Sequence, residues 1–235
     1  NTYTNPIFPL GGSEFVISAR FSLPYSLWNG IDYANLGELE KYQDDDGNPD
    51  PAKIEQEKFR WLEFYKVKFK GSWYTRLFDK LVLRTHTEFG FLGAFNNDRG
   101  VIPFDRFFLG GDGMSQYAMD GRETISLRGY PNQSLSTQDG STIYNRFSLE
   151  LRYPITLKPA ASIFGLTFLE TGQGYNSFRE FNPFNGKRSL GLGLRIFMPA
   201  FGLLGIDFGY GLDAVNDFDL TPNGWETHFV IGQQF

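Results

Sequence analysis

The sequence predicts an all-β fold, an antiparallel β-barrel that spans a membrane, and three observations support this prediction. Several segments alternate apolar and polar residues with a period of two, over the roughly 9–11 residues that a membrane strand needs. The connections between them alternate between long and short, which is typical of an up-and-down sheet. The 235 residues include 25 Phe and 27 Gly, a bias that favours strands and close backbone packing. No helix is expected.

Eight strands are expected, each from one alternating run. The clearest is residues 146–155, where Phe147, Leu149 and Leu151 lie on one face while Arg146 and Glu150 lie on the other. The run at 162–171 is the least regular. In chain order, the runs cover residues 14–23, 65–73, 81–91, 146–155, 162–171, 190–198, 204–212 and 225–235.

The connections are expected to separate by length onto the two ends of the sheet. Long loops are predicted at about residues 25–60, 96–142, 172–188 and 213–224. Short turns are predicted at 75–80, 156–161 and 199–203, where Asp79, Pro159, Pro199 and Gly202 supply turn residues. Long loops at one end and tight turns at the other are the pattern of outer-membrane barrels.

Alternation alone leaves open which face of the sheet is inside. A soluble sandwich or barrel, for example a carbohydrate-binding domain, has the same period with its apolar face inward. The polar face here mixes Gly with Arg, Lys and Glu, which suits a wet lumen. This mixture, the segregated loops and the aromatic end of the last strand favour the membrane barrel.

Composition excludes several kinds of protein and site. The net charge is −5, so a nucleic-acid binder is not expected. There is no Cys, which excludes disulfides and thiol catalysis, and only His86 and His228 are available for a His-rich metal site. The acidic tract 44–50 fails the EF-hand pattern, because Tyr42 and Lys53 stand where acids are needed. No catalytic residue, metal site or cofactor is predicted.

Other polar residues have plain structural interpretations. His86 is expected to be a structural residue that faces the lumen, although barrel hydrolases use a His beside a Ser or carboxylate. Lys66, Lys68 and Lys70 lie on one lumen face and are expected to pair with acidic neighbours across strands.

Two segments carry recognisable motifs. Leu127-Arg128-Gly129-Tyr130 lies in the longest loop, after the stretch 108–113 (FLGGDG), and the chain ends in the strand 225–235 with a terminal aromatic residue. Together they resemble the sixth extracellular loop and the C-terminal signal strand of BamA-type outer-membrane β-barrel assembly proteins. Residues 149–155 and 199–208 also resemble the corresponding parts of this family, so the resemblance covers essentially the whole chain.

The resemblance implies roles for particular residues. Arg128 would fold into the lumen and meet acidic wall residues, for which Glu150 and Glu170 are the candidates; an Arg in an ordinary surface loop is the alternative. The last strand would form a lateral seam that can open toward lipid. Its expected residues are Trp225, Phe229, Ile231, Gly232 and Phe235.

The resemblance also implies an organisation and a function. Residues 1–235 would be the C-terminal half of a barrel of about 16 strands, and thus a piece of a longer protein that also holds periplasmic POTRA domains. That protein would be the non-enzymatic central subunit that folds and inserts outer-membrane proteins in a Gram-negative bacterium. Its partners would be the N-terminal half of its own barrel, the POTRA domains, accessory outer-membrane lipoproteins, unfolded clients and the bilayer, with no nucleic acid. A polypeptide-exporting relative and a passive porin are the alternatives. The acidic loop 29–58 is a candidate docking surface.

Overall fold

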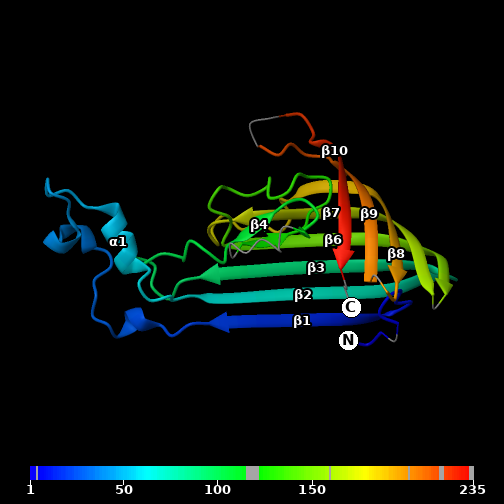
Figure 1. Ribbon diagram of the computed structural model, residues 1–235, viewed down its shortest axis with the longest axis horizontal. Helices are drawn as coiled ribbons and strands as arrows, with labels where there is room; N and C mark the ends of the chain where they lie inside the picture. Colours follow the sequence, from blue (N-terminus) through cyan, green and yellow to red (C-terminus); the bar gives the residue numbers. More distant parts are fainter. Residues whose placement is uncertain (4, 115–121, 159, 201, 217–219, 233–235) are drawn as a thin grey trace.

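One eight-stranded antiparallel sheet forms most of the computed structural model, which describes residues 1–3, 5–114, 122–158, 160–200, 202–216 and 220–232. Each strand pairs with the next along the chain, in the order β1-β2-β3-β6-β7-β8-β9-β10 (Figure 1). The predicted all-β class and the eight antiparallel strands are therefore confirmed. The strands are β1 (Gly12–Phe21), β2 (Tyr65–Phe78), β3 (Leu81–Gly93), β6 (Ile143–Lys158), β7 (Ala161–Tyr175), β8 (Lys187–Met198), β9 (Gly202–Gly211) and β10 (Gly224–Gly232).

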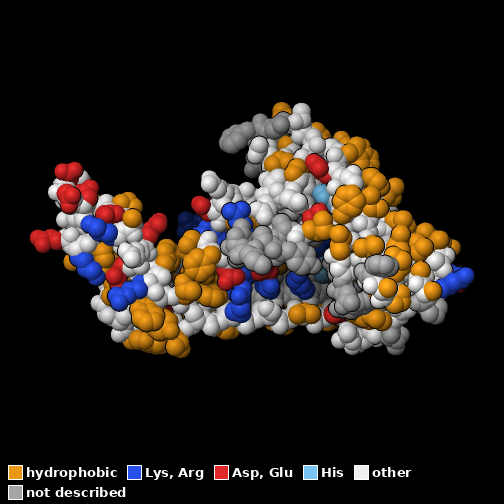
Figure 2. All heavy atoms as spheres, in the orientation of Figure 1, with side chains coloured by type: hydrophobic (Ala, Val, Ile, Leu, Met, Phe, Trp, Pro, Cys, Tyr) orange, Lys and Arg blue, Asp and Glu red, His pale blue; other side chains and the backbone are white. Residues whose placement is uncertain are grey.

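The two faces of the sheet differ as the alternation predicts. On β6, Leu149 and Ile155 are 44% and 65% exposed, whereas Ser148 and Glu150 are at most 3% exposed. The outer face carries exposed apolar side chains and the concave face carries buried charged ones. Lys, Arg, Asp and Glu side chains are visible on the concave side in Figure 2. A one-residue slip would turn buried charges toward lipid, at a cost of about 2–4 kcal/mol per Arg near the bilayer midplane.

The side chains of β7 explain why its alternation of apolar and polar residues is irregular. Phe164, Leu166 and Phe168 all face the interior, where they form a buried cluster with Phe8 and Val82. This lumen is therefore partly apolar at its wall. Because apolar residues occupy both faces of β7, alternation is weak there.

The connection between β1 and β2 contains helices, so the expectation of none was wrong. It holds η1 (Tyr25–Leu27), η2 (Leu36–Glu38), η3 (Glu40–Tyr42) and α1 (Pro51–Lys58). The Asp50 carboxylate accepts the backbone N–H groups of Ala52 and Lys53, and Pro51 takes the first helical position. No helix in the described residues is long and apolar enough to cross a membrane.

A second small sheet, also not expected, lies in the connection between β3 and β6. Its strands β4 (Phe107–Leu109) and β5 (Glu123–Ile125) are parallel. Leu109, Ile125 and Leu127 pack with Tyr144 of β6 in a buried apolar cluster. The connection therefore folds back against the wall of the sheet (Figure 1).

The long connections leave the sheet at one end and the tight turns at the other (Figure 1). The third long connection is shorter than expected, because β7 continues to Tyr175 and leaves 176–186 rather than 172–188. Strands β1 and β10 are the two edges, and among the described residues they are not paired with each other.

Candidate functional site: a loop docked on the lumen wall

The motif Leu127–Tyr130 is buried against the inner wall. Leu127 and Tyr130 are fully buried and Arg128 is 5% exposed. Backbone hydrogen bonds in both directions between Leu127 and Gly111 hold the motif to an earlier part of the same loop. The alternative of an Arg in an ordinary solvated loop does not fit this position.

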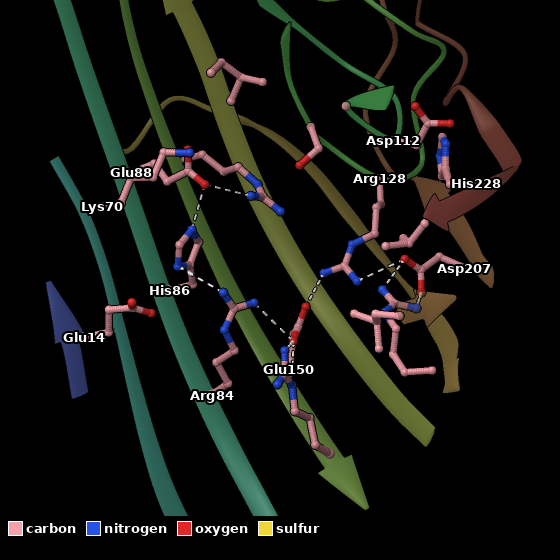
Figure 3. Close-up of a pocket in the computed structure, with 18 of the residues that line it drawn as sticks. Glu14, Lys70, Arg84, His86, Glu88, Asp112, Arg128, Glu150, Asp207 and His228 are labelled. Atoms are coloured by element: carbon pink, nitrogen blue, oxygen red, sulfur yellow. Dashed lines mark hydrogen bonds and ion pairs between the residues drawn. The ribbon is translucent and has the colours of Figure 1, made fainter. Parts of the chain in front are cut away.

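Arg128 reaches three carboxylates on three different strands. Its Nη2 lies 2.8 Å from Glu150 Oε1 and 2.5 Å from Glu170 Oε1, and its Nη1 lies 3.3 Å from Asp207 Oδ2. Its backbone N–H also donates to Glu170 Oε2 at 3.0 Å. Figure 3 shows the side chain extending from the loop toward Glu150 and Asp207. The planar fork of a guanidinium suits such multiple contacts.

The structure thus brings Arg128 to both acids named from the sequence. It adds Asp207, which was not named as a partner. The alternation of residues 204–212 places Asp207 on the polar face of its strand, so a signal for it was present. The alternation could not show that Asp207 lies close to Arg128 across the curled sheet.

Each of these carboxylates also has an arginine on the sheet. Arg152 binds Glu150, Arg146 lies 2.7 Å from Glu170, and Arg195 lies 2.7 and 2.6 Å from the two oxygens of Asp207. The charged side chains of the wall are therefore paired with one another, and Arg128 is an additional cation supplied by the loop.

The surroundings keep Arg128 charged and oriented. Burial alone would lower its pKa, but the carboxylates of Glu170 and Glu150 outweigh burial and raise the pKa above its ordinary value. The guanidinium carbon lies 3.7 Å from the ring centroid of Phe168, a cation–π geometry. A cavity of about 460 Å³ adjoins this group and is lined by both charge signs.

Tyr130 ties the end of the motif to the next connection. Its hydroxyl donates to the carbonyl of Arg188 at 2.7 Å and accepts the N–H of Asp213 at 3.2 Å. Burial raises the pKa of Tyr130 to about 12. The hydroxyl therefore stays protonated and can donate throughout the physiological pH range.

A second ionic anchor lies nearer the long-loop end. Lys66 is 1% exposed, and its ammonium lies 2.7 Å from Glu123 and 3.2 Å from Asp105, both in the loop. Lys68 also binds Glu123. Two of the three lysines thus pair with the loop rather than across strands; only Lys70 faces an acid of the neighbouring strand, Glu88.

His86 also lies in this wall. It contacts Ser72 through Nδ1 and Glu88 through Nε2, each at 2.7 Å, and is buried. Glu88 in turn binds Arg146. His86 and Glu88 both line the cavity beside Arg128, and Arg146 joins this group to the charges of the wall. Among the described residues, no cluster of three or more acidic or His side chains could hold a metal ion.

The ion pairs of Lys66 with Asp105 and Glu123 lead us to expect that acid loosens the loop. Burial alone would raise the pKa of Asp105 and Glu123. Lys66, with Arg20 at Asp105 and with Lys68 at Glu123, outweighs burial, so both pKa values lie below their ordinary ones. Such carboxyls stabilise the folded form above their ordinary pKa and lose this contribution as the pH falls through the lowered value. We expect a docked loop above about pH 5 and a looser one below about pH 4.

Hydrogen–deuterium exchange of β4 and β5, corrected for the intrinsic pH dependence of exchange, would measure this loosening. Amides of β8 serve as the internal control. Glu123→Gln should exchange faster already at neutral pH and respond less to acid. Equal corrected rates for the native loop across this pH range would contradict the expectation.

The last strand presents an apolar outer row. Trp225, Phe229 and Ile231 of β10 are 52–67% exposed on the face away from the loop. Gly232 pairs with Leu203 and adopts φ +152°, which side chains rarely tolerate. Phe235 lies outside the described residues. As the sheet order shows, β9 is the one neighbour of β10 in the described part of the chain.

An apolar outer face, a charged inner wall and a loop folded onto that wall define a transmembrane β-barrel protein of the outer-membrane type. The chain belongs to the Omp85 superfamily, because the family profile described as "Omp85 superfamily domain" matches residues 51–235. BamA from Haemophilus ducreyi, in a crystal structure lacking POTRA domains 1–3, has a similar fold with a TM-score of 0.62 and 19% sequence identity. The match covers 98% of this chain and 40% of that one. No curated protein sequence matches.

Proposed function

We propose that this chain is the C-terminal half of the barrel of the central outer-membrane protein assembly subunit, which folds and inserts client barrels through a lateral seam. The observation that carries this proposal is the docking of Leu127–Tyr130 on the lumen wall through Arg128. The docked loop braces the wall from inside. Any opening would then be concentrated at β10, whose outer edge has no partner strand among the described residues.

The edge of β10 is suited to receive a client strand. An edge strand presents unpaired N–H and C=O groups, and an incoming strand can add to them by β-augmentation. Gly232 has no side chain to pack, which weakens pairing near the end of β10. This step needs no covalent chemistry, so we propose no enzymatic activity.

The other half of the barrel would come from the same polypeptide. Free sheet edges are not tolerated in a bilayer, so β1 and β10 need further strands. The chain spans 40% of the BamA chain that it matches. We propose a closed barrel of about 16 strands, preceded by POTRA domains. Accessory lipoproteins and unfolded outer-membrane clients would be its partners, in a Gram-negative outer membrane.

A passive porin and a polypeptide-exporting relative are the two alternative functions. A passive porin needs an open lumen, and the buried loop with β4 and β5 against the wall disfavours it. A polypeptide-exporting relative would share the fold, so the depletion experiment below distinguishes it from the assembly subunit.

Depletion of the full-length protein in its native cells tests the proposal. We expect several unrelated outer-membrane barrels to fall together while periplasmic proteins persist, as quantified by mass spectrometry. Loss of a single secreted substrate, with barrel levels unchanged, would instead establish the exporter.

A further inference from the structure

The peptide unit on each side of Gly129 is held by one residue in the middle of the last strand and one residue just before it. The Gly129 N–H donates to His228 Nε2 at 2.9 Å, and the Gly129 carbonyl accepts from Asn223 Nδ2, also at 2.9 Å. His228 lies on β10 and is 5% exposed; Asn223 directly precedes β10. The loop motif is thus bonded to the strand that the proposed function makes the seam.

The fit at Gly129 depends on the absence of a side chain. Gly129 adopts φ +88°, and a Cβ there would lie 2.9 Å from Ser189 Cβ and 3.0 Å from the Gly211 nitrogen. A Cβ on Gly209 would lie 2.6 Å from the Gly129 nitrogen. The backbone at Gly129 therefore lies directly on the backbone of β9 and against the Ser189 side chain of β8. This close approach brings the peptide within reach of His228.

The protonation state of His228 follows from its contact. A ring nitrogen that accepts an N–H carries no proton, so Nε2 is the acceptor of a neutral imidazole with its proton on Nδ1. Replacing the ring by an apolar side chain would leave the Gly129 N–H buried without an acceptor.

We propose that His228 and Asn223 form a latch that couples the docking of the Arg128 loop to the pairing of β10 with β9. Strand β10 is bonded to β9 on one side, and the latch adds a second attachment from the lumen. Release of the loop removes this attachment and frees β10; release of β10 removes two hydrogen bonds from the loop. Such coupling is reciprocal by thermodynamic necessity.

His228 and Asn223 are positioning residues in this proposal. The coupling itself rests only on the contacts above. Its role as a gate rests on the proposed function, because it requires that β10 be the seam.

The test uses the full-length protein in detergent micelles and the variant His228→Leu. One readout is trypsin cleavage after Arg128, which is buried when the loop is docked. The other is hydrogen–deuterium exchange of residues 224–232. We expect both to rise together, by about tenfold, within the usual range of coupling between sites.

His228→Gln is the rescue variant, because its side-chain oxygen can accept the same N–H. We expect both readouts to return toward native values. Thr227→Val, on the exposed face of the same strand, is the matched control and should change neither. Heat-modifiable gel migration checks that each variant is folded. If His228→Leu fails this check, Asn223→Ala replaces it and is expected to raise both readouts.

The proposal is overturned if β10 exchange rises while Arg128 stays resistant to trypsin, or if neither readout changes in a folded variant. Equal loosening in the Leu and Gln variants would also overturn it, since a lost acceptor would not be the cause. Neither readout involves a client protein. Failure of the proposed function in the depletion experiment can therefore be told apart from failure of the latch proposal.

Discussion

Replacing Arg128 by alanine is expected to release the lumen loop and to leave the strands folded. The variant removes hydrogen bonds to three carboxylates, and each bond to a charged group contributes about 1.5–3 kcal/mol. The desolvation cost of burying the guanidinium offsets part of this gain. We expect a net loss of about 3 kcal/mol in docking, which corresponds to roughly a 100-fold larger undocked population.

The wall should survive this change because its charges are paired without the loop. Glu150 keeps Arg152, Glu170 keeps Arg146, and Asp207 keeps Arg195. No carboxylate is left without a cation. Under the proposed function, client insertion should fall in cells, while the barrel itself remains heat-modifiable on gels.

Hydrogen–deuterium exchange would separate these effects. Amides of β4, β5 and residues 127–130 should exchange faster in Arg128→Ala, and those of β6–β8 should not. Arg179→Ala, at an exposed position in the next long connection, is the matched control. Arg128→Lys should give an intermediate result, because an ammonium cannot reproduce the planar contacts. Unchanged growth together with unchanged loop exchange would refute the bracing role.

The second large effect is expected at the outer end of the same loop. Arg99 Nη1 lies 2.8 Å from Glu63 Oε2, and the two side chains are 2% and 0% exposed. The guanidinium carbon of Arg99 also lies 5.6 Å from the ring centroid of Tyr33. Glu63 further accepts the N–H and the hydroxyl of Ser26. Arg99→Met leaves this buried carboxylate without its cation, at a cost of about 3–5 kcal/mol.

The helical connection 22–64 should loosen in Arg99→Met. Its own apolar core is small, formed by Tyr33, Leu36 and Tyr42, and cannot offset such a loss. We expect exchange of residues 31–54 to rise at least about 100-fold, with β6–β8 unaffected. The double variant Arg99→Met, Glu63→Gln should loosen the connection less, because no buried charge is then left without a partner. A double variant as loose as the single one would show that lost packing dominates. Arg60→Met, at an exposed position, is the control.

The helices of this connection show where sequence reasoning fell short. Helix α1 has only eight residues and no buried residue, so its periodic signal is weak. Asp50 followed by Pro51 was an available start signal. The short strands β4 and β5 left no signal at all. At three residues each, their pairing depends on the loop meeting the wall.

The candidate site was predicted in part. Arg128 was placed in the lumen by its motif, and Glu150 by the alternation of its strand. Glu170 was less certain from sequence, because Phe164, Leu166 and Phe168 face inward on the same strand. Asp207 and His228 were visible as residues but not as partners of the loop.

The sequence by itself determined the number of main-sheet strands, which residues share a face of each strand, and the end at which the long connections lie. Those properties depend on neighbouring residues and on a period of two, which the chain carries locally. Only the tertiary structure decided the partners of the loop. Arg128 meets Asp207 across 79 positions of the sequence, and Gly129 meets His228 across 99. Contacts of that range depend on the curl of the sheet, which is the sum of many small twists between strands and which no local segment encodes.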